Sequence, residues 1–227
     1  MRKFQVVVLV LLLSLSTRSQ QFNQITFAGA STLSWFTFKT DQDILIRISD
    51  DGKVLEWGTE LMSERSVNYY SPRLQPYLGR VTYYGTEADS VSRGKLKSVG
   101  TCVFTYFPAS EMDEKKGKLR SVGRINLDYY TRFDNLNLKG KLRSIGTTTL
   151  EYYSMIESDA VKGKLKSVGG TTIVYNSVFD DKLIQGKIKS IGAVSYNWGT
   201  SRDIKYAGAL KSGSYRQNIN GIVYILQ

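Results

Sequence analysis

Two series of basic side chains, repeated at a constant spacing, are the residues of this 227-residue chain that could act together in chemistry. Both series are counted from a glycine that recurs every 23 residues, from Gly94 to Gly186. Cations at a fixed spacing can bind the charges of a polyanion, although long basic side chains are also found simply solvated at protein surfaces. One position after each glycine stand Lys95, Lys118, Lys141, Lys164 and Lys187, and three positions after it stand Lys97, Arg120, Arg143, Lys166 and Lys189.

A row of aromatic residues is the second candidate for binding. Counting positions from the opening glycine as offsets, Phe107, Tyr130 and Tyr153 stand at offset thirteen. This offset has the opposite parity from the apolar residues of the repeat, so we expect the three rings to be exposed on the solvent side of a strand. Exposed rings in a row could stack on sugars.

Residues for catalysis or metal binding are scarce. The chain contains no histidine, which removes the usual general base and the commonest transition-metal ligand. Its one cysteine, Cys102, stands at an offset filled by apolar residues or threonine in the other repeats, so we expect a small core residue. Carboxylate pairs fall in the variable segments, unlike the buried pairs of glycosidases. We therefore expect no catalytic, cofactor-binding or metal site and a protein that is not an enzyme, with an uncharacterised hydrolase as the third alternative.

The elements that must position these side chains are β-strands. Each repeat has Leu or Ile at offset two, Ser at four, Gly at six, a large residue at ten and Tyr or Trp at twelve. A period of two predicts strands with one buried face. Val or Ile at offset five breaks this alternation, which we attribute to a turn or bend at the glycine of offset six. We predict two strands per repeat, at about offsets one to five and seven to thirteen.

The fold class predicted from these patterns is all-β, with a 23-residue repeat array. The constant period favours a β-solenoid-like stack, because coils must share one length to stay in register. An antiparallel meander of hairpins or an up-and-down barrel is the alternative. The segments are an N-terminal antiparallel meander that caps the array over 20–60, a crossing loop and degenerate repeat over 61–93, five repeats over 94–208, and a degenerate C-terminal cap strand over 209–227.

The phrase Gly-Lys-Leu-Lys-Ser-x-Gly resembles the bacterial MORN-type repeats, in the variant that joins a Tyr-Tyr pair to an Asn-Gly-Lys-Leu turn. The resemblance covers residues 94–192 and includes Tyr129-Tyr130 and Tyr152-Tyr153. The tyrosine pairs lie farther from the next Gly-Lys than in that family, and the family's second Gly-rich turn is missing. The resemblance implies a stack of short β-strands used for binding or scaffolding, and it transfers no active site.

The beginning of the chain has the pattern of a secretory signal peptide over residues 1–19. Arg2-Lys3 precedes a short apolar run, and small residues stand before a cleavage point after Ser19. We therefore expect export by a signal peptide, to the periplasm, the cell surface or the medium. Without Arg2, Lys3 and Arg18 of this segment, the formal net charge falls from +11 to about +8, which still favours an anionic polysaccharide or another envelope polyanion as partner, and no nucleic acid.

Together these patterns predict a secreted, non-enzymatic repeat protein with a structural, adhesive or envelope-polymer-binding role. Self-association through the edges of the repeats is a further expectation. The alternative is an outer-membrane β-barrel, in which the aromatic residues at offset twelve would form an interfacial girdle.

Overall fold

A computed structural model describes residues 20–60 and 73–227. The signal peptide expected over 1–19, and the part of the crossing loop over 61–72, lie outside the described residues. The described chain contains twenty β-strands and no helix, which confirms the predicted all-β class. In particular, it contains no helix of the length and apolarity that crossing a membrane requires.

The repeats form one open sheet of eleven strands, in which every strand pairs antiparallel with the next one in sequence, from β6 to β16. The repeats are therefore successive hairpins of an antiparallel meander, which was the alternative to the β-solenoid-like stack that the constant period favours. The strands are β6 Val81–Tyr83, β7 Leu96–Val99, β8 Cys102–Tyr106, β9 Leu119–Val122, β10 Ile125–Tyr129, β11 Leu142–Ile145, β12 Thr148–Tyr152, β13 Leu165–Val168, β14 Thr171–Tyr175, β15 Ile188–Ile191 and β16 Val194–Ser195.

A two-residue turn joins the two strands of each repeat. Its first residue is the glycine of offset six, whose φ lies between 55° and 59° in all five repeats, whereas the residue after it does not have a left-handed φ. Positive φ at the first position alone is typical of a type II′ hairpin turn, which prefers glycine there. The predicted turn at offset six is therefore confirmed.

A β-bulge at offset three joins each repeat to the next. Tyr106 pairs with Leu119 and Thr105 pairs with Ser121, so Arg120 has no residue opposite it. The same register shift recurs between all neighbouring repeats. One extra residue reverses the parity of the strand. The bulge, and not the glycine of offset six, is therefore why the residues at offsets two and five both face the core.

A second sheet of seven strands brings the two ends of the described chain together. Its order is β19-β20-β1-β2-β3-β4-β5, and β20 lies parallel to β1. Asn220 and Gly221 both have positive φ in the turn before β20, as a type I′ turn requires. The strands are β1 Gln21–Ala28, β2 Thr32–Lys39, β3 Leu45–Ile48, β4 Val54–Glu60, β5 Leu74–Pro76, β19 Arg216–Ile219 and β20 Ile222–Leu226, and a separate pair consists of β17 Asn197–Trp198 and β18 Leu210–Ser212.

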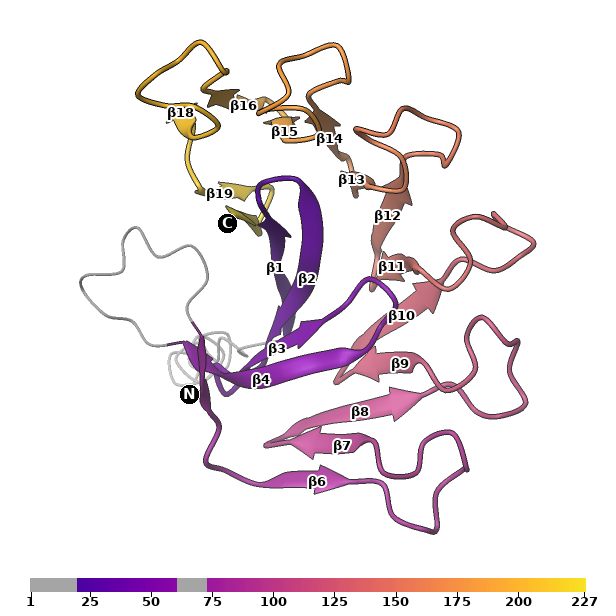
Figure 1. The fold of residues 1–227 in the computed structure, drawn as a ribbon. Helices are drawn as coiled ribbons and strands as arrows, with labels where there is room; N and C mark the ends of the chain where they lie inside the picture. Colours follow the sequence, from indigo (N-terminus) through magenta and orange to yellow (C-terminus); the bar gives the residue numbers. More distant parts are fainter. Residues whose placement is uncertain (1–19, 61–72) are drawn as a thin grey trace, which may run out of the picture.

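The two sheets share one hydrophobic core, and the repeat sheet fans around β1 to β4 (Figure 1). Backbone hydrogen bonds join them far apart along the array, from Leu142 N to Asp50 O at 2.7 Å and from Ile188 N to Ala30 O at 2.8 Å. Segment 20–60 was expected to cap one end of the array. It lies instead along the inner face, because the buried residues of every repeat need an apolar surface to pack against.

Candidate functional site

The lysine at offset one is an internal connection between repeats. Lys118 Nζ donates hydrogen bonds to Gly140 O at 2.8 Å and to Asp51 O at 2.9 Å. The same ammonium lies 5.2 Å from the centroid of the Tyr129 ring, which is fully buried. One side chain therefore connects its own repeat, the next repeat and the N-terminal sheet.

All five lysines at offset one repeat this arrangement. Each donates to the carbonyl oxygen of the glycine that opens the next repeat, and each lies 4.8 to 5.2 Å from the centroid of the aromatic ring at offset twelve of its own repeat. The ring is tyrosine in four repeats and tryptophan in the fifth. The pairs of lysine and acceptor glycine are Lys95 and Gly117, Lys118 and Gly140, Lys141 and Gly163, Lys164 and Gly186, and Lys187 and Gly208.

These lysines are only partly exposed, and Lys141 also pairs with Asp50 at 3.0 Å. Burial lowers the pKa of Lys95, Lys118, Lys164 and Lys187 from the ordinary value. Carbonyl oxygens and ring faces satisfy an ammonium without bringing a full negative charge to it. The row at offset one, predicted as part of a polyanion-binding ladder, thus has its donors directed into the protein.

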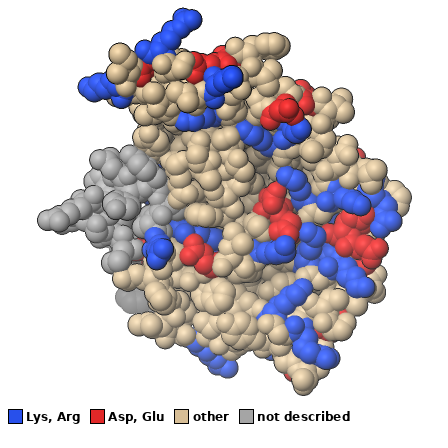
Figure 2. Space-filling model, viewed as in Figure 1, with Lys and Arg blue, Asp and Glu red and all other residues tan. Residues whose placement is uncertain are grey.

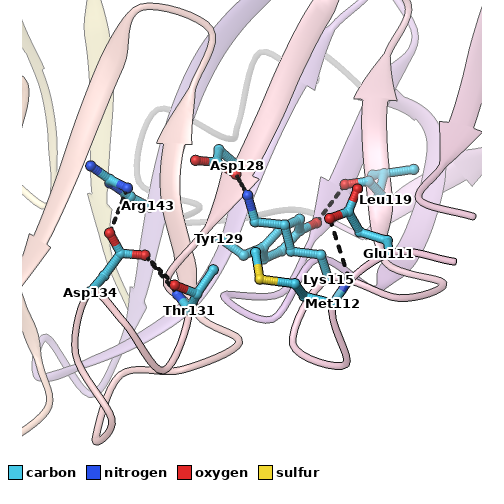
Figure 3. Close-up of polar contacts among 9 residues, drawn as sticks. All are labelled: Glu111, Met112, Lys115, Leu119, Asp128, Tyr129, Thr131, Asp134 and Arg143. Atoms are coloured by element: carbon cyan, nitrogen blue, oxygen red, sulfur yellow. Dashed lines mark hydrogen bonds and ion pairs between the residues drawn. The ribbon is translucent and has the colours of Figure 1, made fainter.

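The row at offset three is exposed in all five repeats. Arg143 pairs with Asp134, whose carboxylate lies 2.8 Å from the guanidinium (Figure 3). Asp134 also accepts hydrogen bonds from Thr131 Oγ1 at 2.7 Å and Thr131 N at 2.9 Å. The hydrogen bonds from Thr131 hold the pKa of Asp134 below its usual value, so this carboxylate stays charged at neutral pH.

The other cations of this row lie beside aromatic rings or carboxylates of the preceding repeat. The charge of Lys189 contributes to lowering the pKa of Asp180, although hydrogen bonds from Ser177 contribute more. The remaining three heads lie 5.6 to 6.0 Å from ring centroids. These pairs of cation and ring are Lys97 and Tyr84, Arg120 and Phe107, and Lys166 and Tyr153.

The predicted exposed aromatic row is wrong on exposure. Phe107, Tyr130 and Tyr153 are half-buried and pack against the core, each with its ring edge-to-face against the offset-twelve ring of the next repeat at 5.9 to 6.1 Å. Tyr130 Oη donates to Leu150 O at 2.9 Å. The strand ends at offset twelve, so strand parity no longer sets the direction of the next side chain. Phe107 and Tyr153 also lie beside the cations Arg120 and Lys166, so these two rings contact the offset-three row.

A recurring turn in the loops fixes the position of the carboxylates, and its sequence pattern could have been recognised from residue types alone. Ser or Thr at offset fourteen and Asp at offset seventeen form the same hydrogen-bonded turn in three repeats. Lys115 and Asp128 form a further ion pair at 2.5 Å (Figure 3). Figure 2 shows the outcome, with Lys and Arg interspersed with Asp and Glu over the outer loops of the array.

Residues for other chemistry are not grouped in the described parts of the chain. Among residues 20–60 and 73–227, no three or more carboxylate or Cys side chains lie close enough together to hold a metal ion. Cys102 is fully buried, which confirms the predicted core position, and burial raises the pKa of its thiol to about 12. No protein-family model, curated protein or solved structure that was compared with this chain matches it significantly.

Proposed function

We propose that this chain is an exported, non-enzymatic β-repeat protein that binds an anionic polysaccharide of the cell envelope through its offset-three row. The observation that supports the proposal is the division of the basic residues into two kinds. The offset-one lysines donate into the protein, whereas the offset-three cations are exposed at the same place in every repeat. The row that remains available to a ligand is Lys97, Arg120, Arg143, Lys166 and Lys189.

The spacing of this row suits an extended polymer. Equivalent residues lie on every second strand of the antiparallel sheet, so their charges recur about every 10 Å, twice the usual distance between strands. That distance is comparable to the length of a disaccharide unit. It also keeps neighbouring cations about one Debye length apart at physiological salt, so their mutual repulsion is small.

The aromatic rings beside Lys97, Arg120 and Lys166 restrict these three cations without neutralising them, whereas Arg143 pairs with Asp134. A guanidinium or ammonium beside a ring keeps its full charge and its outward donors, and loses less side-chain freedom when a polymer binds. A regular sheet with restricted cations is better suited to a repeating anion than a set of mobile surface lysines would be.

The test compares two variants of equal charge on immobilised heparin. In the first, Lys97, Arg120, Arg143, Lys166 and Lys189 are all changed to Gln. In the second, five exposed basic residues of the loops, Lys139, Lys162, Lys182, Arg202 and Lys205, are changed to Gln. We expect the first variant to elute at clearly lower salt than the second. Equal elution of the two would mean that net charge alone governs retention, and it would contradict the proposal.

A further inference from the structure

The N-terminal sheet covers the first two repeats unequally. At the second repeat, the turn between β3 and β4 packs directly on Tyr129, so closely that a Cβ on Gly52 would lie 1.9 Å from the tyrosine hydroxyl. At the first repeat, the equivalent Tyr106 is partly exposed, whereas all of its later counterparts are buried. The buried aromatic row of the array therefore reaches solvent beside this turn.

A cavity of about 590 Å³ lies at this position, between β4 of the N-terminal sheet and β6 to β8 of the repeat sheet. Its apolar walls include Val54 and Trp57 from one sheet and Tyr83, Leu96 and Tyr106 from the other. A concave, mostly apolar site of this size between two layers is typical of a small-molecule pocket.

The charged residues at the cavity are unbalanced. Four lysines, Lys53, Lys95, Lys116 and Lys118, line it together with one carboxylate, Asp51. Asp51 already pairs with Lys53 at 2.9 Å. The two half-buried lysines, at offset one, donate to backbone carbonyl oxygens, and Lys116 is exposed at the rim. The cavity thus combines an apolar interior with positive charge that no carboxylate in its lining balances.

We propose that this cavity binds an amphipathic carboxylate, with the apolar body between Trp57, Tyr83 and Tyr106 and the carboxylate toward Lys116 at the rim. The charged groups of the lining are four lysines and one carboxylate, which match a single anionic group better than the several hydroxyls of a sugar ring. A neutral apolar ligand would leave the excess of lysines uncompensated, so charge complementarity selects an anion. The site is separate from the offset-three row and does not depend on it.

The direct test is a fluorescence titration with 11-(dansylamino)undecanoate and with its methyl ester as the neutral counterpart. We expect the acid to bind saturably at one equivalent, and the ester to bind at least fivefold more weakly. Lys116 is exposed, so Lys116→Gln should leave folding intact. It is expected to weaken binding of the acid at least threefold while hardly affecting binding of the ester. Tyr83→Ser, at a side chain that is 54% exposed, is expected to weaken both probes.

Two control variants are available on the outer face of the same sheet. Lys166→Gln matches the lost charge, and Val103→Ser, at a side chain that is 47% exposed, matches the lost apolar surface. Both are expected to bind the acid like the wild type. Absence of saturable binding, equal affinity for acid and ester, or equal effects of Lys116→Gln and Lys166→Gln would each overturn the proposal. The heparin variants with an altered offset-three row should still bind the probe, so the two proposals fail independently.

Discussion

The ammonium of Lys118 lies 5.2 Å from the centre of the Tyr129 ring, and the hydroxyl of that ring donates a 2.7 Å hydrogen bond to Leu119 O, the residue next to the lysine. The lysine ammonium and the tyrosine ring of one repeat therefore fix each other's position. A partly buried cation over a ring contributes about 1–2 kcal/mol, so this pair helps to hold the two strands of one hairpin together, while the hydrogen bond from Lys118 to Gly140 O connects that hairpin to the next.

Removing the offset-one ammonium should destabilise the fold. Lys118→Met keeps the apolar stem but leaves the carbonyls of Gly140 and Asp51 without their donor, which costs about 1–3 kcal/mol in the free energy of unfolding. Arg120→Met, two residues away and exposed, should change it by less than about 0.5 kcal/mol. Urea denaturation measures both, and equal effects would contradict an internal role for Lys118.

The tyrosine hydroxyls at offset twelve should differ in importance. Tyr129 Oη donates to Leu119 O, whereas the buried hydroxyl of Tyr152 has no hydrogen-bond partner among the described residues. Tyr129→Phe should therefore cost about 1–2 kcal/mol, and Tyr152→Phe should be neutral or stabilising, because it removes an unsatisfied buried group. Thermal and urea unfolding of the two variants measure both changes. A greater loss of stability for Tyr152→Phe than for Tyr129→Phe would contradict these hydrogen-bond assignments.

The two glycines of one hairpin turn should respond oppositely to alanine. Gly169 has a φ of 57°, so Gly169→Ala is expected to destabilise by about 1 kcal/mol through backbone strain. Gly170 does not have a left-handed φ, and a Cβ there would contact nothing within 4 Å. Gly170→Ala should be neutral or stabilise by about 0.4–1 kcal/mol, because it restricts the unfolded chain. Similar losses for both variants would exclude the type II′ turn.

Alkaline pH should destabilise the fold through its buried tyrosines. Burial raises the pKa of Tyr196 and Tyr224 to about 12, and it also raises the pKa of Tyr129, Tyr152 and Tyr175 well above the ordinary value. The tyrosines of the unfolded chain ionise near pH 10. The stability that comes from keeping these phenols neutral in the fold is therefore complete below pH 10 and decreases as the pH rises toward 12.

Lys95, Lys118, Lys164 and Lys187 act in the opposite direction, because burial lowers their pKa, but their shifts are smaller. The melting temperature should therefore fall by several degrees between pH 9 and pH 11. A melting temperature that stays constant over this range would show that the phenols are not buried.

Local features of the repeat were predictable from residue types. The glycine of offset six and the even apolar positions predicted the two strands and the turn between them, since turn chemistry and side-chain parity are short-range properties. The bulge was not predictable, because it depends on how a strand pairs with the preceding repeat. From the sequence, Arg120 is indistinguishable from an ordinary outward-facing strand residue. Only the pairing with β8, which leaves no residue opposite Arg120, shows the bulge.

The pairing of the N-terminal and C-terminal strands could not be predicted from the sequence. The parallel pairing of β20 with β1 joins residues about two hundred positions apart, and nothing local in Gln24 or Val223 encodes it. The different environments of Lys118 and Arg120 also depend on contacts between residues that are far apart in the sequence. Both are basic residues at odd offsets, and only the carbonyl of the next repeat and the nearby turn of the N-terminal sheet distinguish the internal lysine from the exposed arginine.

We propose that the offset-one row stabilises the fold and that the offset-three row is available to a polyanion. Lysine acetylation, followed residue by residue by mass spectrometry with and without a heparin fragment, tests it most directly. We expect fast modification of Lys97, Lys166 and Lys189 that heparin suppresses, and slow modification of Lys95, Lys118, Lys141, Lys164 and Lys187 in both conditions. Fast modification of the offset-one lysines, or protection by heparin that is confined to them, would contradict it.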